Sequence, residues 1–333
     1  MSGAGGRRLG RTPVLSGESP VARTPRLRIL VLGSAGGGGF PQWNCNSEAC
    51  RCARADGSLA RSQSSIAVTA DGEKWVLFNA SPDLRQQIID NAALHPNRGL
   101  RQSPIAGVVL TNADVDHVAG LLTLRESTPF ALYATERVLG TLAENSNFNV
   151  LNPDFVERRP MAIGASFGVK TRDGADIGLE VEPFAVPGKA ALYLEDAGAG
   201  ENFGTRAEDT IGVGVRAPST GAEFFYIPGC TAMSPELAAR LRGAPLVLFD
   251  GTLWRDDEMI EAGIGVKTGR RMGHMSMSGE DGSMAAFEPL GVGRKVFLHI
   301  NNSNPTLLTD TPERRAAEAA GWEIAFDGME ICL

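Results

Sequence analysis

The sequence has few aromatic residues and few histidines, and it lacks any long apolar run. Aromatic residues make up 6% of its 333 residues, and histidine occurs 4 times. No apolar stretch reaches the roughly 18 residues that a membrane-spanning helix needs, which argues against an integral membrane protein. Basic residues are not in excess either, because 32 Lys and Arg stand against 39 Asp and Glu, for a net charge of -7. This balance argues against a nucleic-acid partner, whose phosphates would need neutralising, and favours small-molecule chemistry.

A disulfide framework is also missing. The 5 cysteines are odd in number; Cys45, Cys50 and Cys52 lie close together, whereas Cys230 and Cys332 are isolated. No signal peptide with an apolar core is found, so we expect a reducing, cytoplasmic compartment, where a tight cysteine cluster is typical of a metal site or of reactive thiols. The cluster has the density of a thiolate zinc site but supplies three of the usual four ligands, and buried free thiols are the alternative.

Residues 1–26 differ in composition from the rest of the chain. Arginine, glycine, proline and serine dominate them, a composition typical of a disordered basic tail. The aliphatic run 27–32 then predicts a buried strand at the start of the folded part. No linker interrupts residues 27–333, so we expect one domain there.

Apolar runs and turn residues predict a chain of strands with helices interspersed. Asp71 and Gly72 predict a hairpin between the strands on either side of them. A capping residue followed by proline, at Ser81 and at Thr311, predicts two helix starts. Further strands are predicted at 105–110, 177–186, 190–194, 210–216, 223–227, 245–250 and 294–300, and further helices at 118–125, 234–242 and 278–289. This order favours an α/β fold of two packed sheets covered by helices.

Polar side chains follow the predicted strand 105–110. Asn112, Asp114, Asp116 and His117 lie within one strand-to-helix loop, which can direct alternate side chains at one ion. Carboxylates and a neutral imidazole suit zinc, manganese or ferrous iron, and one carboxylate with two histidines matches the facial arrangement of non-haem iron. Helix capping by either aspartate is the alternative at this spacing.

Three more candidates lie at strand ends or beside glycine. His299 ends an apolar strand, and His274 follows Gly273, which lets backbone approach closely. Asp250 ends another apolar run, as a site residue or as a turn former. The glycine run 36–39 lacks both the GxGxxG spacing and the Lys-Ser/Thr of a phosphate-binding loop, so it gives little support to a nucleotide site.

Ordered blocks between residues 27 and 333 resemble the PqqB family of pyrroloquinoline quinone (PQQ) biosynthesis proteins, which belongs to the metallo-β-lactamase superfamily. The runs FPQWNCN, NASPD, MGH and HINNSNP carry much of this resemblance. It implies a metallo-β-lactamase-like αββα sandwich with its site at one edge of the two sheets. The blocks span residues 34–46, 79–83, 116–122, 250–252, 272–274 and 299–305.

The superfamily motif HxHxDH falls on residues 112–117 and is incomplete. Asn112 and Asp114 replace both leading histidines, and no acid stands around Cys230, where the superfamily has a bridging carboxylate. These departures weaken a two-metal hydrolase. The superfamily positions that are retained are Asp116, His117 and His299. The resemblance implies that they hold one reactive metal, which we predict to be Fe(II).

A supporting set is predicted around that metal. His274 is expected to act as a ligand or as acid and base, and Asp114 and Asp250 to orient imidazole N–H groups. The family's Cys-x-Cys-x-x-Cys pattern implies a second, structural zinc, Zn(II), but Ser47 replaces the middle cysteine here. With the fourth ligand open, the predicted thiol ligands are Cys45, Cys50 and Cys52.

The resemblance implies a step in PQQ biosynthesis: iron- and oxygen-dependent hydroxylation of the tyrosine-derived ring of a Glu-Tyr dipeptide precursor. The partner is then a small peptide-derived substrate, with other PQQ-pathway proteins as further candidates. A carrier that assists transport of PQQ or its precursor to the periplasm, and a metallo-hydrolase, are the alternatives. A single ferrous ion with open positions suits oxygen chemistry, which a carrier does not require.

The segment 187–206 is rich in glycine and alanine, and we expect a mobile loop near the site. Its Lys189 and Arg206 have two interpretations. They either meet the carboxylates of the dipeptide or are exposed solubilising charges.

The composition of the tail generates a prediction about stability. A protein that starts at Leu27 is expected to melt at the same temperature as the full chain, because residues 1–26 have no apolar side chains in a pattern that could pack. Thermal unfolding of the two proteins checks this. A loss of more than roughly 4 °C, which is about 1 to 2 kcal/mol for a chain of this size, would show that the tail packs on the domain.

Overall fold

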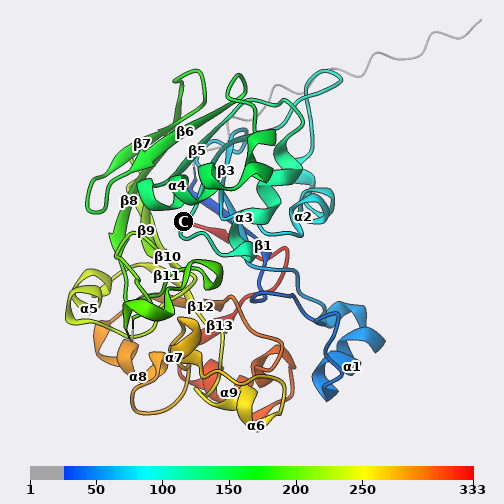
Figure 1. Cartoon of the computed structure of the whole chain (residues 1–333), viewed down its shortest axis with the longest axis vertical. Helices are drawn as coiled ribbons and strands as arrows, with labels where there is room; N and C mark the ends of the chain where they lie inside the picture. Colours follow the sequence, from blue (N-terminus) through cyan, green and yellow to red (C-terminus); the bar gives the residue numbers. More distant parts are fainter. Residues whose placement is uncertain (1–25, 201) are drawn as a thin grey trace, which may run out of the picture.

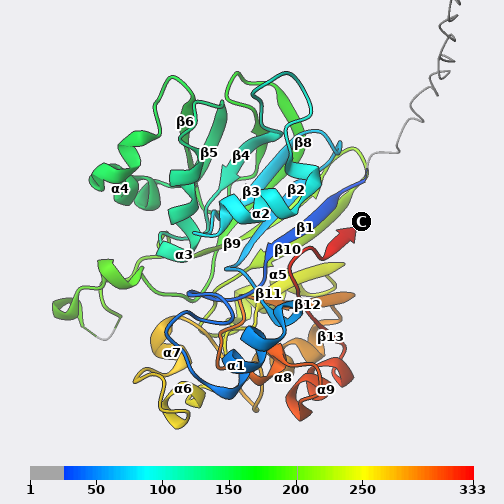
Figure 2. The same cartoon turned by 90° about the vertical axis from the view of Figure 1, so that its right-hand side faces the viewer.

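The computed structural model describes residues 26–200 and 202–333. Two seven-stranded β-sheets pack face to face, and helices cover the outer face of each sheet (Figure 1, Figure 2). The predicted αββα sandwich is therefore confirmed. The predicted tail lies outside the described residues except for Arg26.

The strands of each sheet come mostly from one half of the chain. The first sheet has the order β14-β1-β2-β3-β4-β5-β6 and the second the order β13-β12-β11-β10-β9-β8-β7. The first sheet contains β1 (Arg28–Gly33), β2 (Ser65–Thr69), β3 (Trp75–Phe78), β4 (Ile105–Val109), β5 (Phe130–Thr135), β6 (Val156–Met161) and β14 (Glu330–Cys332). The second contains β7 (Phe167–Lys170), β8 (Asp176–Ala185), β9 (Ile211–Ala217), β10 (Ala222–Ile227), β11 (Leu246–Asp250), β12 (Arg294–Leu298) and β13 (Trp322–Ile324).

Strand direction gathers several loops at one edge. The predicted hairpin is confirmed, because β2 and β3 pair antiparallel across the Asp71–Gly72 turn. From β3 to β6 in the first sheet, and from β10 to β13 in the second, neighbouring strands run parallel. The carboxyl ends of parallel strands meet at the same edge, where α/β proteins commonly build their sites.

The helices are short and lie in the connections. The α-helices are α1 (Glu48–Ala55), α2 (Leu84–Asp90), α3 (Val115–Val118), α4 (Glu136–Glu144), α5 (Pro235–Leu241), α6 (Glu258–Glu261), α7 (Gly269–Met272), α8 (Ser283–Phe287) and α9 (Pro312–Ala319). The 3-10 helices are η1 (Gly57–Leu59), η2 (Ala92–Leu94), η3 (Ala119–Leu124), η4 (Ser146–Val150), η5 (Leu192–Leu194), η6 (Ala197–Ala199), η7 (Glu288–Leu290) and η8 (Pro305–Leu307).

Three apolar layers hold the sandwich together. The central layer lies between the sheets and includes Val31 from the first and Leu248 from the second, both fully buried. A second layer packs α2, η3 and α4 on the outer face of the first sheet. The third packs α5, α8 and α9 on the second sheet, where Trp322 stacks on Phe297 with ring centroids 3.7 Å apart. Strands buried on both faces explain the continuous aliphatic runs in the sequence.

Some predicted elements differ from those observed. Residues 190–194 form no strand: the Ala190 N–H donates to the Thr205 hydroxyl at 3.0 Å, and η5 occupies Leu192–Leu194. The predicted helices 118–125 and 278–289 are each split between a short α-helix and a 3-10 helix. The helix predicted to start at Ser81 begins later, with Asp83 as its N-cap residue, whereas the start capped by Thr311 is confirmed.

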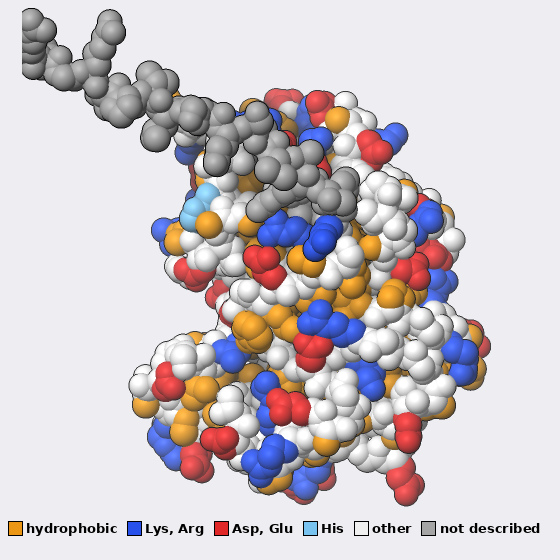
Figure 3. Space-filling view, turned by 180° about the vertical axis from the view of Figure 1, so that it is seen from behind, with side chains coloured by type: hydrophobic (Ala, Val, Ile, Leu, Met, Phe, Trp, Pro, Cys, Tyr) orange, Lys and Arg blue, Asp and Glu red, His pale blue; other side chains and the backbone are white. Residues whose placement is uncertain are grey.

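Charges on the surface are mixed. On the face shown in Figure 3, basic and acidic side chains are interspersed over both lobes, so that face presents no continuous basic strip. Within the part of the chain that the structure describes, no helix is long and apolar enough to cross a membrane.

Glycine at position 120 lets η3 pack directly on the loop after β3. A Cβ atom built there would lie 2.2 Å from the Ser81 carbonyl oxygen. The Gly120 N–H donates to the Ala80 carbonyl at 2.8 Å, and the Ala80 N–H donates to the His117 carbonyl at 2.7 Å. This close approach therefore determines where His117 lies.

We predict that Gly120→Ala lowers the free energy of unfolding by about 1 to 3 kcal/mol, because backbone must move to admit the methyl group. The matched control is Gly140→Ala in α4, where a Cβ meets nothing within 4 Å. That change should stabilise the protein by about 0.5 to 1 kcal/mol through helix propensity. Chemical denaturation measures both, and equal effects would contradict the packing argument.

Candidate metal centre

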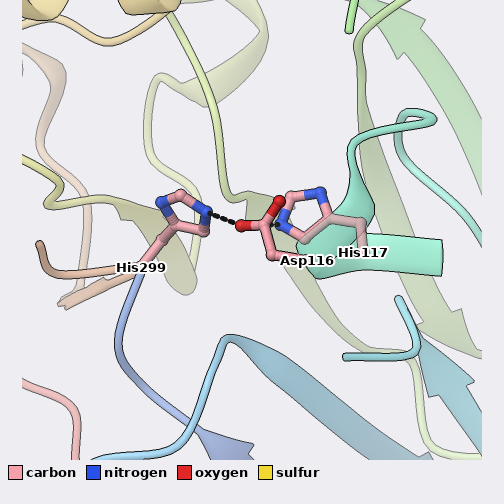
Figure 4. A group of neighbouring side chains, drawn as sticks. All are labelled: Asp116, His117 and His299. Atoms are coloured by element: carbon pink, nitrogen blue, oxygen red, sulfur yellow. Dashed lines mark hydrogen bonds and ion pairs between the residues drawn. The ribbon is translucent and has the colours of Figure 1, made fainter. Parts of the chain in front are cut away.

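The carboxyl ends of three strands bring the candidate residues together. β4 leads into α3, which carries Asp116 and His117, β11 ends at Asp250, and His299 directly follows β12. Figure 4 shows Asp116 between the imidazoles of His117 and His299. These strand ends open onto a cavity of about 370 Å³. Its lining includes Gly37, Gln42, Asn112, Asp114, Asp116, His117, Lys189, Leu192, Gly229, Thr252, Met259, Lys267, Met272, His274, His299 and Asn301.

Asn112 orients the imidazole of His117. The Asn112 Oδ1 atom accepts the Asp114 backbone N–H at 3.1 Å, which identifies it as the amide oxygen, and it lies 2.7 Å from His117 Nδ1. Nδ1 therefore carries the proton, and Nε2 carries a lone pair. Among the described residues this buried Nε2 has no hydrogen-bond partner, and it lies 3.9 Å from Asp116 Oδ2.

Thr252 does the same for His299. The Thr252 hydroxyl donates to Asp250 Oδ1 at 2.6 Å and accepts from His299 Nδ1 at 2.8 Å. His299 Nε2 then faces Asp116 Oδ2 at 3.0 Å, and in the neutral imidazole this nitrogen carries a lone pair. Two lone pairs at this distance repel unless a proton or a metal ion lies between them. Asp116 Oδ2, His117 Nε2 and His299 Nε2 lie within 4.8 Å of one another, so the donor set fits one metal ion.

The protonation states also suit metal ligands. Burial opposes ionisation of Asp116, but the charge of His117 and the hydrogen bond from His299 outweigh it and hold the pKa of Asp116 below its usual range. Burial lowers the pKa of His117. For His299, burial acts in the same direction, but the hydrogen bond and charge of Asp116 prevail and raise the pKa. A proton and a metal ion therefore compete for His299 Nε2.

The backbone supports this geometry at two places. His299 has a φ of 60°, a left-handed conformation that is uncommon for a residue with a side chain and that recurs at functional sites. The glycine run packs against the ligands, since a Cβ atom on Gly36 would lie 3.3 Å from the His299 carbonyl oxygen and one on Gly37 would lie 3.4 Å from Asp116 Oδ2. The glycine run 36–39 thus lies beside the candidate ligands.

His274 and Asp250 form a pair next to the ligands. His274 Nδ1 donates to Asp250 Oδ2 at 2.7 Å, and the His274 ring stacks on that of His299 with centroids 5.1 Å apart. Asp250 is fully buried and also accepts the backbone N–H of Cys230 at 3.0 Å. In the described part of the chain, His274 Nε2 makes no hydrogen bond, and His274 lines the cavity.

Asp114 reaches His117 only through Asn112. Its Oδ2 accepts from Asn112 Nδ2 at 3.0 Å, and its Oδ1 accepts the Leu192 backbone N–H at 3.4 Å. The sequence marks Asn112 only as a member of the polar loop and as the replacement of a histidine, and it does not single out Thr252. Asn112 stands three positions past the end of β4 and Thr252 two past the end of β11, and this placement is the signal for their role.

The structure does not assemble the three predicted thiol ligands. Cys45 Sγ contacts Ser47 Oγ at 3.3 Å, and Asn302 Nδ2 contacts Cys50 Sγ at 3.6 Å. Cys50 and Cys52 lie two positions apart on α1, and side chains at that spacing face different sides of a helix. No group of three metal-ligating residues found among 26–200 and 202–333 includes a cysteine. As folded here, the loop does not fit a three-thiolate site, and a structural zinc on it stays a prediction.

The segment 187–206 places one of its two predicted cations at the cavity. Lys189 lines the cavity, whereas Arg206 is exposed, and its backbone N–H donates to Asp209 Oδ2 at 2.7 Å. The segment contacts the loop between β4 and α3, because the Tyr193 hydroxyl donates to the Ala113 carbonyl at 2.6 Å.

Comparison with known proteins agrees with this geometry. Residues 74–300 match the family model described as a beta-lactamase superfamily domain. With this family match and its αββα fold, the chain is a metallo-β-lactamase superfamily protein.

The particular family follows from full-length relatives. Coenzyme PQQ synthesis protein B of Bradyrhizobium diazoefficiens is 55% identical over 309 residues, which cover 92% of this chain and 100% of the relative. The protein of the same name from Xanthomonas oryzae pv. oryzae is 53% identical with the same coverage. The crystal structure of Zn(2+)-bound PqqB from Methylobacterium extorquens matches with 50% identity and a TM-score of 0.86, over 92% of this chain and 100% of that one. The chain belongs to the PqqB family.

The contact between Asn112 and His117 generates a prediction. Asn112→Ala is expected to weaken metal binding by about 10- to 100-fold, because His117 loses the acceptor that fixes its tautomer and ring orientation. Competition with a chromophoric chelator measures the affinity for Zn²⁺ and Fe²⁺. The control is Asn147→Ala, whose side chain is exposed. Unchanged affinity in Asn112→Ala would show that His117 needs no such support or binds no metal.

Proposed function

We propose that the protein catalyses iron- and oxygen-dependent hydroxylation of the tyrosine-derived ring of a Glu-Tyr dipeptide precursor in PQQ biosynthesis. The observation that carries the proposal is the donor set, one carboxylate and two imidazoles whose ligand atoms lie within 4.8 Å of one another. Non-haem iron oxygenases use this 2-His-1-carboxylate arrangement. The names of the PqqB relatives support the pathway.

Asp116, His117 and His299 would hold the ferrous ion, and when bound it supplies the capacity to activate dioxygen. Asn112 and Thr252 keep both imidazole Nδ1 atoms protonated, so that each Nε2 faces the centre. Burial of both histidines limits access of bulk water to the ligand atoms. These contacts prepare the site before a metal arrives, which is the condition for tight binding.

His274 is placed to move protons for the reaction. Asp250 holds its Nδ1 proton, which leaves Nε2 at the cavity wall to accept a proton from a phenolic substrate and return it. Because Asp250 is buried and hydrogen-bonded on both oxygens, it also stabilises the charged imidazolium that forms. Asp114 contributes by holding Asn112 in place.

A zinc hydrolase with two metals fits these residues less well. Asn112 stands where the superfamily has a histidine, and burial raises the pKa of the Cys230 thiol to about 12, so it stays neutral near pH 7. The Cys230 Sγ also donates to the Ala232 carbonyl at 3.1 Å. A carrier would have no use for buried, oriented metal ligands. A structural Zn²⁺ and contacts with other pathway proteins remain compatible with the oxygenase.

The proposal predicts that ferrous-loaded protein consumes oxygen when given the cross-linked Glu-Tyr dipeptide. His117→Ala should lose both bound iron and turnover, since one of three ligands is gone. His274→Ala should keep most of its iron and react about 10²- to 10⁴-fold more slowly, as expected for loss of an acid–base group. An oxygen electrode and iron analysis of anaerobically purified protein give the two readouts.

Equal oxygen consumption by wild type and His117→Ala would overturn the oxygenase and favour the carrier. Hydrolysis of a substrate by zinc-loaded protein, with no oxygen uptake by the ferrous form, would favour the hydrolase.

A further inference from the structure

Two lysines, Lys189 and Lys267, line the cavity at the candidate metal centre. The lining aspartates, Asp114 and Asp116, accept hydrogen bonds from Asn112 and His299. The lining also includes apolar side chains such as Leu192 and Met259. Two ammonium groups beside apolar side chains suit an aromatic molecule with anionic groups.

Lys189 is held in place over a glycine. Gly273 has a φ of 100°, and a Cβ atom there would lie 2.9 Å from Lys189 Cγ, so the lysine stem crosses this residue in close contact. Its Nζ donates to the Ala190 carbonyl at 3.2 Å, and its side chain is 19% exposed. The lysine has therefore already lost much of its conformational freedom, which lowers the entropic cost of binding an anion.

The nearest acid, Glu195, is shared among three cations. Glu195 is paired with Arg271, whose two terminal nitrogens donate to its two oxygens at 2.8 and 2.6 Å. Phe203 packs under the same guanidinium, with the Arg271 carbon 3.8 Å from the ring centroid. Lys189 Nζ forms an ion pair with Glu195 at 3.9 Å, beyond hydrogen-bond distance. The hydrogen bond from Arg271, then the charges of Arg271, Lys189 and Lys267, lower the pKa of Glu195, so three cations surround one carboxylate.

We propose that Lys189 and Lys267 bind two carboxylates of an aromatic dicarboxylate substrate and so turn its ring toward Asp116, His117 and His299. The proposal rests on the proposed function, because it concerns the substrate of the same centre. The proposal goes beyond the proposed function because it names the residues that select a negatively charged substrate. Residues 192–199 project from the body beside α3 (Figure 2). They include Glu195, which accepts hydrogen bonds from Arg271.

Calorimetric titration of zinc-loaded protein with the cross-linked Glu-Tyr dipeptide tests the proposal. We expect Lys189→Met and Lys267→Met each to weaken binding about tenfold, the effect of losing one charge-assisted hydrogen bond. Lys189→Arg should retain most of the affinity. The diamide of the same dipeptide, which lacks the negative charges, should bind weakly and equally to all variants. Lys170→Met, at an exposed position on β7, is the matched control.

Glu195→Gln separates substrate binding from a structural role of the lysines. If they bind carboxylates, removing a competing negative charge should strengthen dipeptide binding. If Lys189 instead serves to hold Glu195, both Glu195→Gln and Lys189→Met should weaken binding of dipeptide and diamide alike, which would overturn the proposal. Absence of dipeptide binding to wild type, or equal affinity for dipeptide and diamide, would also overturn it. Zinc does not support turnover with oxygen, so failure of the oxygenase assay leaves this result valid.

Discussion

The rest of the site depends on the contact between His299 Nε2 and Asp116 Oδ2. Both atoms carry lone pairs once Thr252 takes the other nitrogen of the ring, and they are 3.0 Å apart in a largely buried place. Such a contact is favourable only with a proton or a metal ion between the atoms. His117 Nε2, buried and without a partner among the described residues, adds a third donor. Together the three atoms form a donor set that one metal ion fits.

The scaffold imposes this arrangement from both sheets at once. Asp116 and His117 come from the loop after β4, and Asp250, Thr252 and His299 from the ends of β11 and β12. The apolar layer between the sheets fixes the distance between these loops. Residues that build no bond to the centre still shape it, because the absence of a side chain at Gly120 sets the position of α3. Burial of apolar side chains between the sheets thus holds the few polar atoms of the site in place.

Much of this could be predicted from sequence, and the rest could not for physical reasons. Continuous aliphatic runs and the Asp71–Gly72 turn predict the buried strands and the hairpin, and the resemblance identifies the sandwich. The prediction of a strand at 190–194 is wrong, because local apolar content does not show which groups form hydrogen bonds with the backbone. The short strands β13 and β14 have too few residues to produce a pattern. The roles of Asn112 and Thr252 could not be predicted, because the sequence does not show which imidazole an amide or a hydroxyl contacts.

The most direct test of the account is anomalous diffraction at the iron edge from crystals grown anaerobically with Fe²⁺. The account predicts one iron peak at bonding distance from Asp116 Oδ2, His117 Nε2 and His299 Nε2, with no cysteine sulfur as a ligand. A pair of peaks that engages Asp250 and His274 as ligands, or iron bound only at the Cys45 and Cys50 loop, would contradict it.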